Sequence, residues 1–191
     1  MANGVAMSAT NRWRLFGWAA AVALILTPLV AMQLDAPGVN WTLSDFIFAI
    51  VMIGGTGLLF ELATRMSRNW AYRGAVALAL LASFLIVWIN AAVGILGNED
   101  NPANLVFGVV LAIEIAGVIV AKAKPAPMVR VMAVTAGAQA LIGLAVFARG
   151  IAANEPPGAF GLLMLIEGFA ALWMASALLF AKAARELSQR N

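Results

Sequence analysis

Residues 104–121 read NLVFGVVLAIEIAGVIVA, and Glu114 is the single charged side chain in this run. A stretch of this length and hydrophobicity is typical of a membrane-spanning helix, because about 20 apolar residues at 1.5 Å per residue cross a hydrocarbon layer of about 30 Å. A carboxylate near the middle of such a helix costs about 2.5 to 3.5 kcal/mol on insertion scales. We therefore expect Glu114 to face other helices inside a bundle rather than lipid.

The opposite face of the same predicted helix carries small side chains. Gly108, Ala112 and Ala116 are each four residues apart and lie nearly opposite Glu114 at 100° per residue. Small residues at this spacing let a second helix backbone come close in a membrane. The pattern predicts that this helix is contacted on two faces.

The composition of the whole chain extends this interpretation. The 191 residues are 63% hydrophobic and 11% charged, and the mean hydropathy is +0.94. This apolar content is far above what one soluble core requires. We expect a single all-α domain, 1–191, that forms an integral membrane bundle of six helices. Their predicted bounds are about 15–32, 46–64, 74–96, 104–121, 129–147 and 160–181.

The distribution of positive charge predicts the orientation of these helices. Of the 12 Lys and Arg residues, all but Arg149 lie in the terminal segments or beside the links after the second and fourth predicted helices. Short cytoplasmic segments carry an excess of Lys and Arg in membrane proteins. Both termini are therefore predicted to be cytoplasmic, with the acidic NEDNPA link outside.

Missing residue types exclude several kinds of chemistry. The chain contains no Cys and no His, so it has no disulfide, no thiolate nucleophile, no His acid-base group and no His-ligated metal. We expect no cofactor and no metal site. The sequence pI is about 10.0, but the basic residues flank the apolar segments, which favours anionic lipid headgroups over nucleic acid as partners.

Several short motifs in the first two thirds of the chain are distinctive. They are VNWTLSDF at 39–46, Glu61 with Arg65, AYR at 71–73, VWIN at 87–90 and GNEDNPANL at 97–105. Over about residues 39–121 the chain resembles a family of small, polytopic bacterial inner-membrane proteins of uncharacterised function. The resemblance implies a multi-pass location in the bacterial inner membrane, and it supplies no activity, substrate or site residue.

Polar residues inside the predicted helices form the candidate site. At 1.5 Å per residue from the nearest cytoplasmic basic residue, Glu61, Glu114 and Glu167 lie at depths of about 6, 12 and 22 Å. On the same scale Gln139 lies near the depth of Glu114, and Asn90 near that of Glu167. The candidate intramembrane polar site therefore comprises Glu61, Asn90, Glu114, Gln139 and Glu167.

Two interpretations of these side chains remain open at this point. The carboxylates and amides, bridged by water, could relay protons or bind a cation, as buried acids do in transporters. Alternatively each polar group joins two neighbouring helices by a hydrogen bond. For Glu114 we expect a neutral carboxyl that donates to Gln139, and for Glu61 a surface ion pair with Arg65, four residues on.

Three classes of function follow from these patterns. The sequence favours a non-enzymatic structural, assembly or accessory membrane subunit that binds a membrane-protein partner or a second copy of itself. The alternative is a proton- or cation-linked transporter or channel that uses the buried carboxylates. A membrane enzyme would rely on Glu99 and Asp100 in the NEDNPA link, but these acids also suit a solvated turn that precedes a helix.

Overall fold

The computed structural model describes residues 9–151 and 157–189, and these residues form helices joined by turns, without a β-strand. The prediction of an all-α chain is confirmed, and six helical segments are long and apolar enough to cross a membrane. The described residues fall into two compact units that divide between Leu62 and Ala63. Each unit is described by itself.

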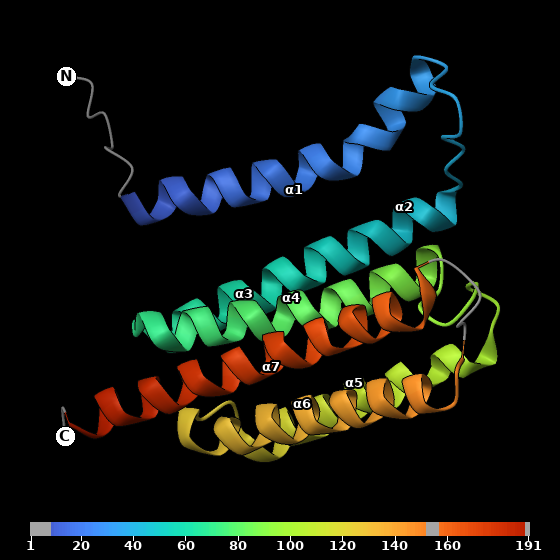
Figure 1. Ribbon diagram of the computed structural model, residues 1–191. Helices are drawn as coiled ribbons and strands as arrows, with labels where there is room; N and C mark the ends of the chain where they lie inside the picture. The colour runs from blue at the N-terminus through green and yellow to red at the C-terminus, as the bar shows by residue number, and fades with distance from the viewer. Residues whose placement is uncertain (1–8, 152–156, 190–191) are drawn as a thin grey trace, which may run out of the picture. The chain divides into compact units, whose positions relative to one another are not determined.

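The N-terminal unit contains two long helical segments. The first is α1 (Ala9–Gln33), and Figure 1 shows that it bends in its C-terminal part. Pro28 lies inside this helix, and proline bends a helix because it lacks an N–H group and its ring clashes with the preceding turn. The bend is therefore explained by one residue.

The second segment of this unit is one continuous helix made of three parts. It begins with α2 (Leu43–Ala49), continues as a π-helical turn η1 (Ile50–Gly54) and ends as α3 (Gly55–Met66), of which the residues up to Leu62 belong to this unit. Thr42 caps the start, because its backbone N–H donates to Oδ2 of Asp45 at 2.7 Å in a capping box. Such reciprocal bonds satisfy donors that an uncapped helix would leave without partners.

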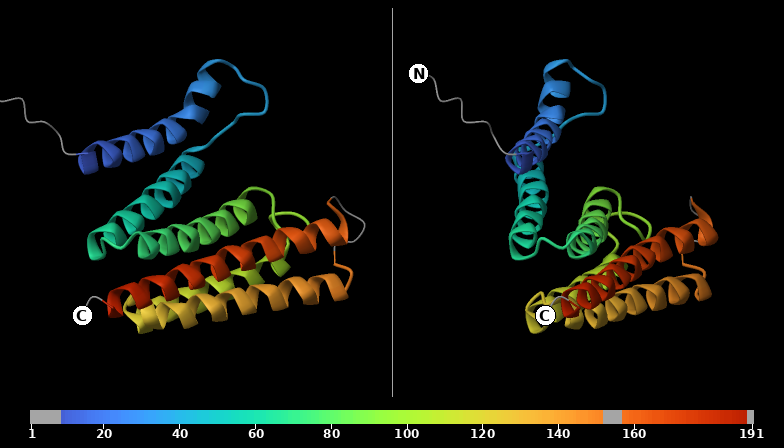
Figure 2. Two further views of the ribbon diagram at one scale, coloured as in Figure 1. Left: turned by 60° about the vertical axis from the view of Figure 1, so that its left-hand side comes forward. Right: turned by 90° about the vertical axis from the view of Figure 1, so that its left-hand side faces the viewer.

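The C-terminal unit is a bundle of four helices. They are α4 (Trp70–Ala92), α5 (Leu105–Ala121), α6 (Pro125–Ala148) and α7 (Gly158–Ser188), and the short helix η2 (Pro102–Asn104) precedes α5. In this unit α7 packs against both α4 and α6, and α6 packs against α5. The left view in Figure 2 shows that the chain turns back after α5, so that α6 runs antiparallel to it.

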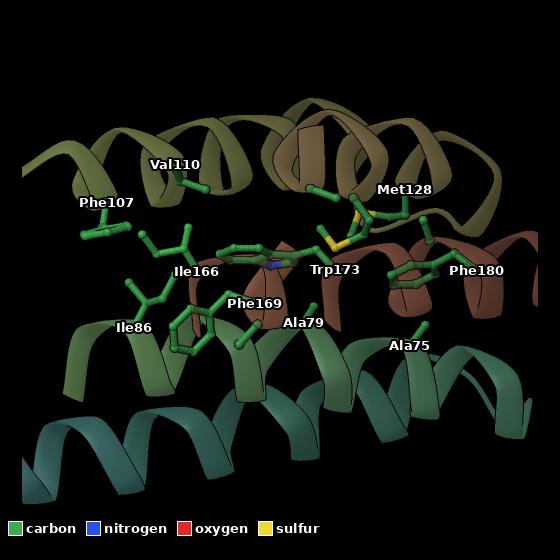
Figure 3. Packing of buried hydrophobic residues seen from close by; sticks show 14 of the residues in the cluster. Ala75, Ala79, Ile86, Phe107, Val110, Met128, Ile166, Phe169, Trp173 and Phe180 are labelled. Carbon is green, nitrogen blue, oxygen red and sulfur yellow. The ribbon is translucent and has the colours of Figure 1, made fainter. Parts of the chain in front are cut away.

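The core of the bundle pairs small side chains on α4 with large ones on α7. Buried alanines recur along one face of α4, and Figure 3 shows Ala75 and Ala79 below the row of aromatic residues on α7. Ser176 of α7 donates from Oγ to the backbone carbonyl of Ala75 at 2.8 Å. A bond from a side chain to the backbone of another helix requires close approach, which the alanines permit.

Asparagine side chains hold the turn between α4 and α5. The helix α4 ends at Ala92, earlier than position 96 expected from the sequence. Gly94 follows with φ of 73°, and a Cβ at this position would lie 2.3 Å from the carbonyl oxygen of Asn98. Asn104 Oδ1 then accepts from the backbone N–H groups of Ile95 and Leu96. The early end follows from a glycine that adopts a conformation unfavourable for other residues.

Candidate functional site

Glu114 lies in the interior of the four-helix unit, as its sequence position predicted. Its side chain is 7% exposed, and its Oε2 lies 2.6 Å from Oγ of Ser83 on α4. The same hydroxyl lies 2.9 Å from the backbone carbonyl of Ala79, one turn earlier. The carboxyl group thus joins α5 to α4 through a single serine.

Ser83 has one hydroxyl proton but two neighbouring acceptors. If it donates to Glu114, the contact with Ala79 is left without a proton, and the reverse also holds. Both contacts are hydrogen bonds at the same time when Glu114 carries a proton and donates to Ser83 Oγ. The geometry therefore accommodates a neutral Glu114 at the end of a short chain of hydrogen bonds that stops at the α4 backbone.

Trp173 is the residue of α7 that lies beside the carboxyl group of Glu114. The side chain is fully buried, and Figure 3 shows it in the middle of the row between Ile166 and Phe180. Its indole nitrogen faces Glu114, yet within the described residues Nε1 makes no hydrogen bond of normal geometry. Glu114 is therefore surrounded by α4 and α7 in addition to its own helix.

Gln139 does not contact Glu114 through any hydrogen bond in the described part of the chain. It is fully buried on α6, and its Nε2 donates at 3.4 Å to the backbone carbonyl of Ile166 on α7. Its Oε1 is buried and finds no donor among residues 9–151 and 157–189. Among the described residues, two other contacts therefore replace the expected hydrogen bond between Glu114 and Gln139. The contact of Glu114 with Ser83 joins α5 to α4, and the hydrogen bond from Gln139 to Ile166 joins α6 to α7.

Glu167 lies near Gln139 at the interface of α6 and α7. Its Oε1 is also buried without a hydrogen bond among the described residues. A Cβ added to Gly143 would lie 2.5 Å from this oxygen and 3.0 Å from Cγ2 of Ile166, so glycine makes room for the carboxylate. Two buried oxygen acceptors, one on α6 and one on α7, therefore lack a donor within the described part of this interface.

Asn90 lies at the end of the bundle that holds the NEDNPA turn. Its Nδ2 donates to the carbonyl of Ile86 in its own helix at 2.8 Å, and its Oδ1 is buried without a partner in the described residues. With Glu99 and Asp100 it lines an open pocket of about 620 Å³ between α4, η2 and the start of α5. The pairing of Asn90 with Glu167 that depth suggested is absent from the hydrogen bonds of the described residues.

Glu61 belongs to the N-terminal unit and joins its two long helices. The guanidinium of Arg14 on α1 donates to Oε1 of Glu61 in an ion pair. Trp18 Nε1 donates to Oε2 at 2.9 Å, and its ring lies 3.4 Å from where a Cβ of Gly57 would be. Sequence reasoning missed both partners because they lie more than 40 positions away in the chain.

The stripe of small residues on α5 is not covered by another helix of the four-helix unit. Gly108, Ala112 and Ala116 are all exposed, and nothing lies within 4 Å of a Cβ added to Gly108. The close helix contact in this unit is made instead by the alanine face of α4 against α7. Both stripes have the four-residue spacing that signals close packing, so spacing alone did not distinguish them.

The described residues contain no group of three His, Cys, Asp or Glu side chains arranged to hold a metal ion. Comparison with known proteins found no matching family model, no matching curated protein and no matching solved structure. A function for this chain therefore has to be inferred from its own residues and their geometry.

Proposed function

We propose that this protein spans the bacterial inner membrane six times, with both termini in the cytoplasm, and acts as a non-enzymatic structural, assembly or accessory subunit. Support for the location comes from the six long apolar helices and from their outer faces. Val120 is 83% exposed and Ile119 70% exposed on α5. Side chains of this kind are stable against hydrocarbon, and such a surface would aggregate in water.

The observation that carries the structural role is the use of polar side chains between helices. Ser83 joins Glu114 across α4 and α5, Ser176 joins α7 to α4, and Gln139 joins α6 to α7. In a bilayer such bonds help to hold helices together, because lipid tails are as apolar as the helix surfaces and hydrophobic burial does not drive their association. Each of the four long helices of the unit takes part in at least one of these bonds, as expected for a scaffold.

The orientation is tested by reporters on the two sides of the membrane. A fusion after Asn191 is expected to be active in the cytoplasm, and a reporter inserted at 98–101 is expected to be active in the periplasm, because Lys and Arg flank the cytoplasmic ends. A reporter inserted at Gly150 serves as a second periplasmic site. The opposite pattern would overturn the proposed topology.

The accessory role requires a surface for a partner, and we assign to it the part of the exposed stripe on α5 that Gly108 and Ala112 form. The occupant we propose is an apolar transmembrane helix of another protein, because small residues allow two backbones to approach within a membrane. The absence of Cys from the chain makes this testable. A thiol-linked photocrosslinker is attached in native membranes to Gly108→Cys or Ala112→Cys, with Leu141→Cys on α6 as an exposed apolar control.

The proposal predicts a discrete adduct from the two stripe positions and none from Leu141→Cys. An adduct of twice the chain mass would show that the partner is a second copy of this chain. Equal labelling from all three positions, or labelling of lipid alone, would refute a docking face on α5.

A second candidate function is favoured by the buried acceptors at the α6–α7 interface. Gln139 Oε1 and Glu167 Oε1 lack donors in the described residues, and each oxygen would be satisfied by water, a proton or a cation. A proton- or cation-linked transporter would bind its proton or cation at these oxygens, between α6 and α7. Reconstituted vesicles should then show a cation flux or a pH response that Glu167→Gln abolishes and Glu186→Gln retains, whereas no flux above protein-free vesicles would rule out this function.

A further inference from the structure

A groove lies between α5 and α6 where the two helices approach their connecting turn. It has a volume of about 590 Å³ and is lined by Ala116, Gly117 and Val120 of α5 and by Pro127, Arg130 and Val131 of α6. This volume falls within the range of about 300 to 1,000 Å³ that ligand pockets occupy. Among these lining residues Arg130 carries the charge.

Close packing at one point creates the floor of the groove. A Cβ added to Gly117 would lie 2.5 Å from Cγ1 of Val131, so α5 and α6 touch where a larger side chain would separate them. Beside this contact Ala116 is exposed and carries a single methyl group. The small residues leave a furrow with apolar walls along the hairpin.

The turn that closes the groove is held in place by α4. Lys122 and Ala123 adopt left-handed conformations with φ of 50° and 53°, which non-glycine residues adopt only where the surroundings enforce it. Tyr72 donates from its hydroxyl to the carbonyl of Ala123 at 3.0 Å. Its ring is 3% exposed and packs edge to face on Phe180, with 5.5 Å between ring centroids. The site is therefore preformed.

Positive charge lies on one wall of the groove, at Arg130, and in the adjoining turn between α5 and α6, at Lys122 and Lys124. Arg130, Lys122 and Lys124 are all exposed. None of the three forms a salt bridge with an Asp or Glu of the described residues. A basic rim above apolar walls matches a ligand with an anionic head and a hydrocarbon tail.

Arg130 specifies the kind of head group. It lies five residues into α6, about 8 Å from the start of that helix at 1.5 Å per residue, where a flexible side chain reaches the level of lipid head groups. A guanidinium group binds phosphate through two parallel hydrogen bonds. We propose that this groove binds one anionic phospholipid, with its phosphate on Arg130 and an acyl chain along Ala116 and Val120. This inference rests on the membrane location proposed above.

The test uses the full-length protein in a neutral detergent, with phosphatidylglycerol as the anionic lipid and phosphatidylcholine as the zwitterionic one. Native mass spectrometry should show one retained phosphatidylglycerol and weaker retention of phosphatidylcholine. Arg130→Gln should weaken phosphatidylglycerol binding about tenfold, since charge-assisted bonds to phosphate are among the strongest polar contacts. Ala116→Leu should weaken binding of both lipids because it fills the furrow.

Arg68→Gln is the matched control, since it removes one exposed positive charge from the same unit but outside the groove. It should leave the lipid affinity unchanged. An equal loss in Arg68→Gln and Arg130→Gln, or the same affinity for glycerol phosphate as for phosphatidylglycerol, would overturn the lipid site. Binding in detergent depends on neither topology nor partner, so its failure is distinguishable from failure of the proposed function.

Discussion

Replacing Ser83 and Glu114 by alanine, singly and together, tests whether their contact holds α4 to α5. Both side chains belong to the four-helix unit, and their oxygen atoms are 2.6 Å apart. Glu114→Ala removes the buried carboxyl group. Ser83→Ala removes the hydroxyl and leaves the carboxyl of Glu114 without this neighbour.

The expected magnitudes follow from the contact and its burial. An interhelical hydrogen bond in a membrane contributes about 0.6 to 2 kcal/mol to the free energy of unfolding. Loss of the Glu114 side chain also leaves a cavity on the order of 50 Å³, which at about 24 cal/mol per Å³ adds about 1 kcal/mol. Glu114→Ala should therefore destabilise the protein by about 2 to 3 kcal/mol. Glu114→Gln should cost less than about 1 kcal/mol, because an amide of similar shape still donates to Ser83.

Reversible unfolding in mixed micelles, followed by tryptophan fluorescence, measures these free energies. The two alanine substitutions should be non-additive by about 0.6 to 2 kcal/mol, the energy of the bond that both remove. Ser83→Ala combined with Ser176→Ala is the control pair, because Ser176 bonds to Ala75 instead, and its effects should add within about 0.5 kcal/mol. A coupling near zero between Ser83 and Glu114 would refute the reasoning.

Three further predictions concern packing within the same unit. Gly143→Ala should destabilise the protein by about 1 kcal/mol, because the new methyl group meets Cγ2 of Ile166 at 3.0 Å and displaces the carboxylate of Glu167, whose Oε1 lies 2.5 Å away. Gly137→Ala, which adds a methyl group in open space, should instead stabilise the helix by up to about 1 kcal/mol. Equal effects of the two substitutions on unfolding in micelles would contradict this. Tyr72→Phe should lower the free energy of unfolding by about 1 kcal/mol by removing a hydrogen bond to the α5–α6 turn, measured against wild type in the same assay. Trp173→Ala should lower the free energy of unfolding by about 3 to 5 kcal/mol, because the buried ring fills the core. Trp173→Phe should lower it clearly less, because the indole N–H makes no normal hydrogen bond in the described residues. Equal losses from the two substitutions would show that the ring volume does not determine the effect.

The positions of the helices could be predicted from local sequence. Runs of about 20 apolar residues bounded by Pro, Gly, Asn and basic residues identify helices without reference to the rest of the chain. Several observed bounds differ from the predicted ones by four residues or more: α4 begins at Trp70 and not at 74, and α7 continues to Ser188 and not to 181. At the C-terminal end of α4 a single local feature, Gly94, explains the difference. The burial of Glu114 was predictable for the same reason, since a carboxylate in hydrocarbon has few stable alternatives.

The partners of the buried polar groups could not be predicted in this way. Depth along a helix follows from counting residues, and it placed Gln139 level with Glu114. Which way each helix is rotated, and which helices are neighbours, depends on how side chains of all four helices pack together. Ser83 therefore emerged as the partner of Glu114 only in the folded unit, and Gln139 turned toward Ile166.

Sequence by itself determined what is local in this protein: the helix-forming segments, their apolar surfaces, the absence of Cys and His chemistry and the burial of Glu114. Tertiary structure alone decided which small-residue face is used, since the alanines of α4 pack on α7 while Gly108 and Ala112 stay exposed in their unit. The physical reason is that the pattern of residues along a helix limits which contacts the helix can make. Which of these contacts form depends on how the surfaces of all the helices pack together.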